Sequence, residues 1–224
     1  MKTTATAPTP DTPTVPAGIK PATFELLISS ATALMQENGC APTIAEVAKR
    51  SGISRATAYR CFPSRSAMLG AMVSHSLGPV RTFASEHAQG KDRVLDLFTR
   101  SFPRLSKYES TMRTAVQLSL EQQALEQAGL LKEQVFRRGH RIKILHKALE
   151  PLAKELPKDI YQQLHASLSL IYGIEIFIVL KDICNLKNKE VKTTMLWMAD
   201  ALIDAARQQA HTRHNSKPKK KTPL

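Results

Sequence analysis

Cysteine and long apolar runs are scarce in this chain, and their scarcity excludes several classes of protein. The 224 residues include three cysteines, Cys40, Cys61 and Cys184, which are widely spaced and form no CxxC pair. Neither a disulfide framework nor a thiolate zinc site is therefore expected. The longest apolar run, residues 176–180, is far shorter than the roughly 20 residues that cross a bilayer. The first residues also lack the apolar segment of a signal peptide, so we expect a soluble protein of the cytoplasm.

The signatures of common catalytic sites are missing as well. The seven histidines are scattered without an HExxH pair, and His140 and His146 are six residues apart, which places them on different faces of a helix. The chain contains neither a glycine-rich phosphate loop nor a GxSxG elbow. We therefore expect a protein that is not an enzyme and that uses no metal or cofactor.

Positive charge, by contrast, is abundant, with a formal net charge of +13 at pH 7. Hydrophobic residues make up 42% and charged residues 23% of the chain, close to ordinary globular usage. The basic excess is spread along the chain and is densest in residues 211–224. It favours a polyanionic partner, but charge alone does not separate nucleic acid from an anionic membrane.

Apolar residues recur at helical spacing from Pro21 to residue 210, and no series of alternating strands and turns interrupts them. With only nine glycines and short loops, the chain is predicted to be all-α. The longest helices are expected at residues 129–156, 158–186 and 190–210.

Residues 43–62 predict two short helices joined by a tight turn. Thr43 and Glu46 have the spacing of a capping box, which starts the first helix. Gly52 follows its last turn, where a left-handed residue is needed. Ser54 then caps a second helix, and the free N–H groups at Thr43 are suited to a phosphate. Two capped helices across a glycine are typical of a helix-turn-helix that reads the major groove.

The second helix is predicted to have a buried and an outward side. The buried side is formed by Ala58, Cys61 and Phe62, whereas Arg55, Ala56, Thr57, Tyr59 and Arg60 lie on or beside the outward one. Arginine can bond guanine bidentately, a threonine methyl can touch thymine, and hydroxyls can bond phosphates. Any one of these residues is more often part of an ordinary solvated face, so the prediction depends on their combination.

Residues 43–69 resemble the DNA-binding motif of TetR-family transcriptional regulators. The matching pieces are Thr43-Ile-Ala-Glu-Val-Ala, Gly52-Ile-Ser, Ala56-Thr-Ala-Tyr, Phe62-Pro-Ser-Arg65 and Met68-Leu69. The resemblance implies a homodimer with two reading heads and an all-helical C-terminal domain. In most members of the family that domain binds a small molecule, which relieves repression.

Position by position, the resemblance implies contacts with bases and phosphates at Thr43, Ser54, Arg55, Thr57, Tyr59, Arg60 and Arg65. Arg65 stands where the family usually has lysine, and it retains the charge. Cys61 stands where histidine or tyrosine is usual. A thiol is a poor donor, so one phosphate contact is missing there or is made by Arg60.

The resemblance and the residue pattern together divide the chain into four segments. We expect a disordered Thr/Pro/Ala-rich arm at residues 1–20 and a three-helix DNA-binding domain at 21–78. A larger helical effector-binding and dimerisation domain is expected at 79–210, and a disordered basic tail at 211–224.

The C-terminal half resembles a subset of the family less specifically. Dimerisation is expected through the last two long helices, whose apolar seam is formed by Leu196, Ala199, Leu202, Ile203 and Ala206. The alternative is that these residues pack only within their own chain. Glu175 either pairs with a basic residue among Arg137, Arg138, His140 and Arg141 or faces a ligand cavity. Tyr172 and Phe177 line a pocket or belong to the core.

The leading hypothesis is a dimeric repressor that binds a palindromic DNA operator and is released by a small-molecule effector. The alternative is an architectural or interaction protein that binds DNA non-specifically, or a membrane, through the basic tail. The sequence leaves open an activator, or a regulator without an effector.

Overall fold

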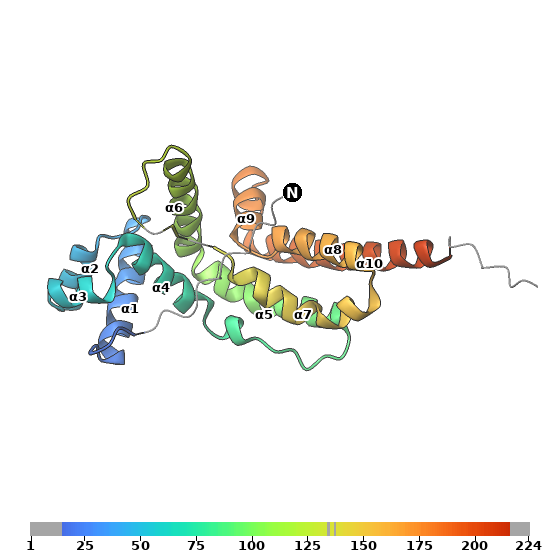
Figure 1. The fold of residues 1–224 in the computed structure, drawn as a ribbon, viewed down its shortest axis with the longest axis horizontal. Helices are drawn as coiled ribbons and strands as arrows, with labels where there is room; N and C mark the ends of the chain where they lie inside the picture. The colour runs from blue at the N-terminus through green and yellow to red at the C-terminus, as the bar shows by residue number, and fades with distance from the viewer. Residues whose placement is uncertain (1–14, 134, 137, 216–224) are drawn as a thin grey trace, which may run out of the picture. The chain divides into compact units, whose positions relative to one another are not determined.

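The computed structural model describes residues 15–133, 135–136 and 138–215, and within these ranges it contains helices and no strand. The elements in chain order are α1 (Pro21–Asn38), α2 (Ile44–Ser51), α3 (Arg55–Cys61), α4 (Arg65–Leu77), η1 (Gly78–Thr82), α5 (Gly90–Lys107), α6 (Glu109–Gln127), α7 (His140–Glu155), α8 (Lys158–Ile171), α9 (Ile174–Phe177), η2 (Ile178–Ile183) and α10 (Asn188–Asn215) (Figure 1). The predicted all-α class is confirmed.

The chain forms two compact units, each built from two stretches of sequence. Unit 1 comprises Met1–Pro79 with Arg104–His140, and unit 2 comprises Val80–Pro103 with Arg141–Leu224. The boundary between units falls inside α5 at Pro103, so most of this helix belongs to unit 2 and its last turn to unit 1.

Unit 1 is organised around α1, which packs against α2, α4 and α6. The ring of Phe24 on α1 lies 5.4 Å from the ring of Phe62, the residue that ends α3. Both rings are buried. Since α3 has only seven residues, too few for a helix that is stable alone, this packing is what holds it in place.

The end of α4 is held by a side chain from the last turn of α5. The guanidinium of Arg104 donates to the carbonyl of Ser76 at 2.7 Å and to that of His75 at 2.9 Å. Gly78 ends the helix with φ +46°, and a Cβ there would lie 2.6 Å from Arg104 Nη2. A cation at this helix terminus satisfies carbonyls that have no partner within the helix.

Unit 2 is built on the packing of α8 against α10. The buried face of α10 is a stripe with steps of four and finally three residues, formed by Val191, Met195, Ala199, Ile203 and Ala206. Three of the five residues expected at a seam between subunits, Ala199, Ile203 and Ala206, are therefore core residues of their own chain. The periodicity correctly indicated a buried face but not its partner, and the assignment of these residues to a dimer seam was wrong.

Arg141 joins three segments of unit 2 at the break between α8 and α9. Its guanidinium donates to the carbonyl of Ser169 at 2.9 Å and to Glu175 Oε1 at 2.6 Å. A Cβ at Gly173 would lie 2.7 Å from Arg141 Nη1, so only glycine leaves room for this arrangement. The structural tie predicted for Glu175 is thus confirmed, with Arg141 as its cation.

Tyr172 and Phe177 are core residues of unit 2. The Tyr172 ring lies 4.9 Å from that of Phe98, and the Phe177 ring 5.2 Å from that of Phe102. The Tyr172 hydroxyl lies 2.8 Å from Ser101 Oγ. Burial raises the pKa of Tyr172 to about 12, although the hydrogen bond with Ser101 and the charge of Arg141 oppose the rise.

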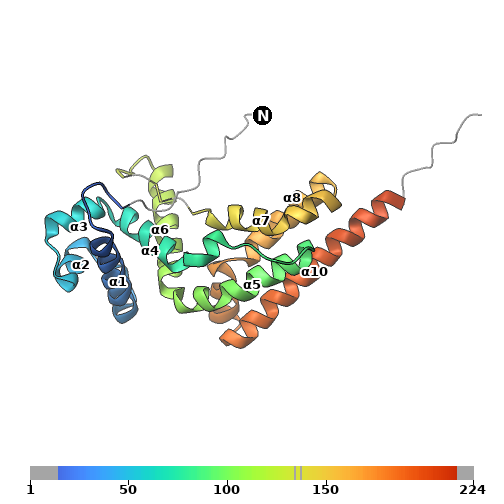
Figure 2. The same ribbon diagram turned by 90° about the horizontal axis from the view of Figure 1, so that it is seen from below.

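The boundaries of the longest helices differ from those predicted. The helix expected at 129–156 begins only at His140, because the chain leaves α6 through Gly129 in a left-handed conformation, φ +71°. The helix expected at 158–186 is broken at Tyr172-Gly173. In the other direction, α10 continues to Asn215 (Figure 2), beyond the predicted start of the tail, and residues 216–224 lie outside the described part.

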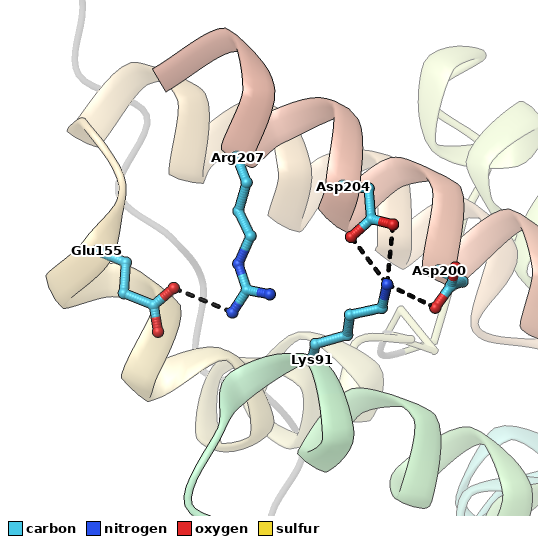
Figure 3. A network of polar contacts seen from close by, with 5 residues as sticks. All are labelled: Lys91, Glu155, Asp200, Asp204 and Arg207. Carbon is cyan, nitrogen blue, oxygen red and sulfur yellow. Dashed lines mark hydrogen bonds and ion pairs between the residues drawn. The ribbon is translucent and has the colours of Figure 1, made fainter. Parts of the chain in front are cut away.

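Ion pairs anchor α10 to the rest of unit 2 (Figure 3). The ammonium group of Lys91 lies 2.8 Å from a carboxylate oxygen of Asp200 and 2.8 Å from one of Asp204, and these hydrogen bonds raise the pKa of Lys91. Arg207 Nη2 pairs with Glu155 at 3.1 Å. Asp200 and Asp204 of α10 are thus already paired with a basic residue of the same unit.

Among the described residues no single helix is long and apolar enough to cross a membrane. Taken together, α8 and residues Ile174–Ile183 are long and apolar enough to span one, but the two helices are bent by 55° relative to each other.

Replacing Arg141 by methionine should lower the free energy of unfolding by about 1–3 kcal/mol, because the half-buried Glu175 carboxylate keeps its charge while losing the guanidinium. Urea denaturation of the full chain measures the loss. The double variant Arg141→Met/Glu175→Leu, which removes both charges, should recover part of it. A double variant less stable than the single one would contradict this account.

Candidate nucleic-acid interface

The first helix of the motif, α2, begins with the predicted capping box. The backbone N–H of Glu46 donates to Thr43 Oγ1 at 3.2 Å, and that of Thr43 donates to Glu46 Oε2 at 2.7 Å. The Thr43 hydroxyl also donates to Glu46 Oε2, at 2.8 Å. These bonds with Thr43 lower the pKa of Glu46. The N–H groups of Thr43 and Glu46 are therefore bonded within the capping box, and the phosphate site at this helix N-terminus stays a prediction.

The turn between the two helices depends on Gly52. Its φ is +69°, and its N–H bonds to the carbonyls of Ala48 and Lys49. The next N–H, that of Ile53, also reaches the Ala48 carbonyl, at 3.2 Å. This is the pattern of a Schellman C-cap, and it ends α2 at the residue expected from the sequence.

The second helix, α3, begins at the predicted cap. Ser54 Oγ accepts the N–H of Thr57 at 3.2 Å and lies 2.9 Å from the Thr57 hydroxyl. The side predicted to be buried is buried, since Ala58, Cys61 and Phe62 are almost inaccessible. The opposite side, with Ala56, Tyr59 and Arg60, is exposed.

The structure places all seven predicted contact residues in unit 1. Thr57 is half-buried, and the exposed ones are Thr43, Ser54, Arg55, Tyr59, Arg60 and Arg65. Five of the seven are on α3 or at its cap, whereas Thr43 and Arg65 stand at the starts of α2 and α4. Across the described part of the chain, no ion pair involves Arg55, Arg60 or Arg65.

Cys61 contributes to the core and not to the exposed face. Its side chain is buried, and burial raises the pKa of its thiol, partly offset by the charge of Arg60. Because the thiol is buried, Cys61 is not available to a phosphate.

One interaction of α3 was not predicted from the sequence. Arg60 Nη2 donates to the carbonyl of Ala17, in the turn before α1, at 3.4 Å. The pattern Pro16-Ala17-Gly18 does predict a turn, but nothing local indicates that a turn 43 residues away in sequence meets α3.

The cap geometry, the left-handed glycine and an exposed basic face on the second helix define a helix-turn-helix of the kind that binds DNA. No group of histidine, cysteine and carboxylate side chains suited to a metal occurs in the described ranges.

Comparisons with known proteins point the same way as the motif. Residues 27–72 match the family described as "Bacterial regulatory proteins, tetR family". The fold is similar to that of a TetR transcriptional regulator from Rhodococcus sp. RHA1, with a TM-score of 0.55, 16% identity, and coverage of 81% of this chain and 95% of that one. No curated protein matches the sequence. The predicted resemblance to TetR-family regulators is thus confirmed for the helix-turn-helix region, and the helical fold agrees with it.

Arg55→Ala and Arg65→Ala should weaken DNA binding in different ways. Losing Arg55 should reduce discrimination between a specific site and random DNA by about 1–3 kcal/mol, whereas losing Arg65 should weaken binding to all sequences alike. Anisotropy titrations on both DNAs at several salt concentrations measure the two effects, and Arg65→Ala should lower the salt slope by about 1. Equal losses on both DNAs for Arg55→Ala would refute its role in base reading.

Proposed function

We propose that the protein is a repressor that binds a palindromic operator as a homodimer and is released by a small-molecule effector. It acts in the cytoplasm and by binding rather than catalysis. Thr43, Ser54, Arg55, Thr57, Tyr59, Arg60 and Arg65 contact the DNA. The two domains are those expected from the sequence, residues 21–78 for DNA binding and 79–210 for effector binding and dimerisation.

The observation that carries this proposal is the face of α3. Its arginines, its tyrosine and the Ser54 at its cap are exposed and Thr57 is half-buried, while the opposite side is fixed in the core. A basic helix held rigidly with small Ala56 at the centre of its outer face can approach the floor of the major groove.

Exposed apolar residues in unit 2 support dimerisation through α8 and α10. Trp197 on α10 is 70% exposed and Leu170 on α8 is 69% exposed. At 100° per residue, Trp197 lies opposite the buried stripe of α10, and Leu170 lies to the side of the buried stripe of α8. Each is beside a small exposed residue of its own helix, Ala201 or Ala166. Large apolar groups so exposed are typical of a contact surface, and small neighbours allow two helices to approach closely.

Footprinting the purified full chain on the DNA that flanks its own gene tests the proposal. A symmetric protected site is expected, with two half-sites that each meet one copy of α3. Protection should decrease when the effector is added from a panel of candidate small molecules. Binding without sequence preference on every fragment would refute operator recognition.

The alternative, non-specific binding through the basic tail, is separated by trimming residues 216–224. Truncation after Asn215 keeps α10 whole, including the ion pair of Arg213 with Asp159 at 2.7 Å. Operator choice should be unchanged under our proposal, and all DNA binding should disappear under the alternative. The charge of the removed lysines is expected to affect only the salt dependence.

Trp197→Asp should separate the dimer, since it places a charge in an apolar contact. Sedimentation should then give the mass of one chain, and operator binding should become weaker and less cooperative. Leu130→Asp is the matched control, because Leu130 is 63% exposed but lies in unit 1. A Trp197→Asp protein that remains dimeric would exclude this face as the interface.

A further inference from the structure

A short turn precedes α1 and contacts α3, the second helix of the helix-turn-helix. The N–H of Ile19 donates to the Pro16 carbonyl at 3.0 Å, which closes the turn. Gly18 has φ +77°, the left-handed value that a type II turn needs at its third residue. The Pro16–Ile19 turn is thus a built local structure whose shape requires glycine.

The guanidinium group of Arg60 contacts this turn. Besides the bond from Nη2 to the Ala17 carbonyl, the same nitrogen would lie 3.3 Å from a Cβ added to Gly18. The guanidinium therefore lies against the backbone at a residue without a side chain. The carbonyl accepts one of the five N–H donors of the guanidinium, and the others stay available.

Arg50 offers a comparison within the same unit. Its guanidinium makes two bonds to the Glu37 carboxylate, at 2.7 and 3.0 Å, so its charge is matched by a carboxylate. The partner of Arg60 is a neutral carbonyl. The contact with Ala17 orients Arg60 without neutralising it, which is the arrangement that a residue needs if it must still bind an anion.

We propose that the Pro16–Ile19 turn is a positioning element of the DNA-reading surface, which holds the Arg60 guanidinium in place for the operator. The inference rests on the proposed function, binding of DNA through α3. An arginine that is free in solution loses rotamer freedom when it binds, whereas one already held loses less. Gly18 thereby contributes to operator choice although the role assigned to it involves no contact with a base.

Gly18→Ala tests the role of the turn. Alanine strains the left-handed backbone and meets Arg60, so binding to the footprinted operator should weaken about two- to tenfold. Binding to random DNA, which depends mainly on charge, should be unchanged. Gly39→Ala is the matched control, with φ +70° and no atom within 4 Å of the added Cβ. Equal losses of operator binding in the two variants would overturn the proposal, and thermal unfolding of both checks that they are folded.

A double-mutant cycle distinguishes positioning of Arg60 from a general effect of the turn. In an Arg60→Ala background, Gly18→Ala should cause no further loss of operator binding, since the side chain that it disturbs is gone. Additive losses would overturn the proposal.

Two truncations separate the turn from the residues before it. A chain that starts at residue 15 keeps the turn and should bind the operator like the full chain, whereas one that starts at residue 19 should lose as much as Gly18→Ala. A loss already at residue 15 would assign the effect to the preceding arm, and tighter binding after removal of the turn would show competition with DNA; either overturns the proposal. If the full chain gives no footprint at all, the proposed function fails as well, whereas a normal footprint unaffected by Gly18→Ala refutes only the positioning role.

Discussion

The burial of one side of α3 is the constraint on which the rest of unit 1 depends. Seven residues form too short a helix to be stable by themselves, so α3 exists and is oriented because Ala58, Cys61 and Phe62 are fixed in the core. The rotation of α3 about its axis decides which side chains face outward. With Phe62 against Phe24, that rotation leaves Arg55, Tyr59 and Arg60 exposed.

Charge is matched in one part of the molecule and unmatched in another. Several basic side chains of both units are paired with nearby carboxylates, as Arg50 is with Glu37, Lys91 with Asp200 and Asp204, and Arg207 with Glu155. On α3 and at the start of α4 the arginines have no ion pair within the part of the chain that the structure describes. The overall excess of +13 is therefore a weaker guide to binding than the position of unmatched guanidinium groups on one rigid face.

Local signals in the sequence predicted most of unit 1. The capping box at Thr43, the left-handed Gly52 and the cap at Ser54 involve bonds over a few residues, and such bonds can be read from spacing alone. Long-range contacts could not be predicted in this way. The stripe on α10 has the periodicity of a buried face whether it meets α8 or another subunit, and Glu175 had several basic residues within plausible reach before the fold selected Arg141. The contact of Arg60 with Ala17 could not be predicted from the residues next to either of them.

The division of α5 has a mechanical consequence. The chain passes between the units at Pro79–Val80, inside α5 at Pro103–Arg104, and in the first turn of α7 at His140–Arg141. Proline has no N–H, so the rod formed by α5 lacks one internal bond where the boundary crosses it, and it bends there at lower elastic cost than elsewhere. Two of the three crossings carry a proline. The one internal hydrogen bond that α5 lacks thus falls at the residue where its sequence divides between the two units.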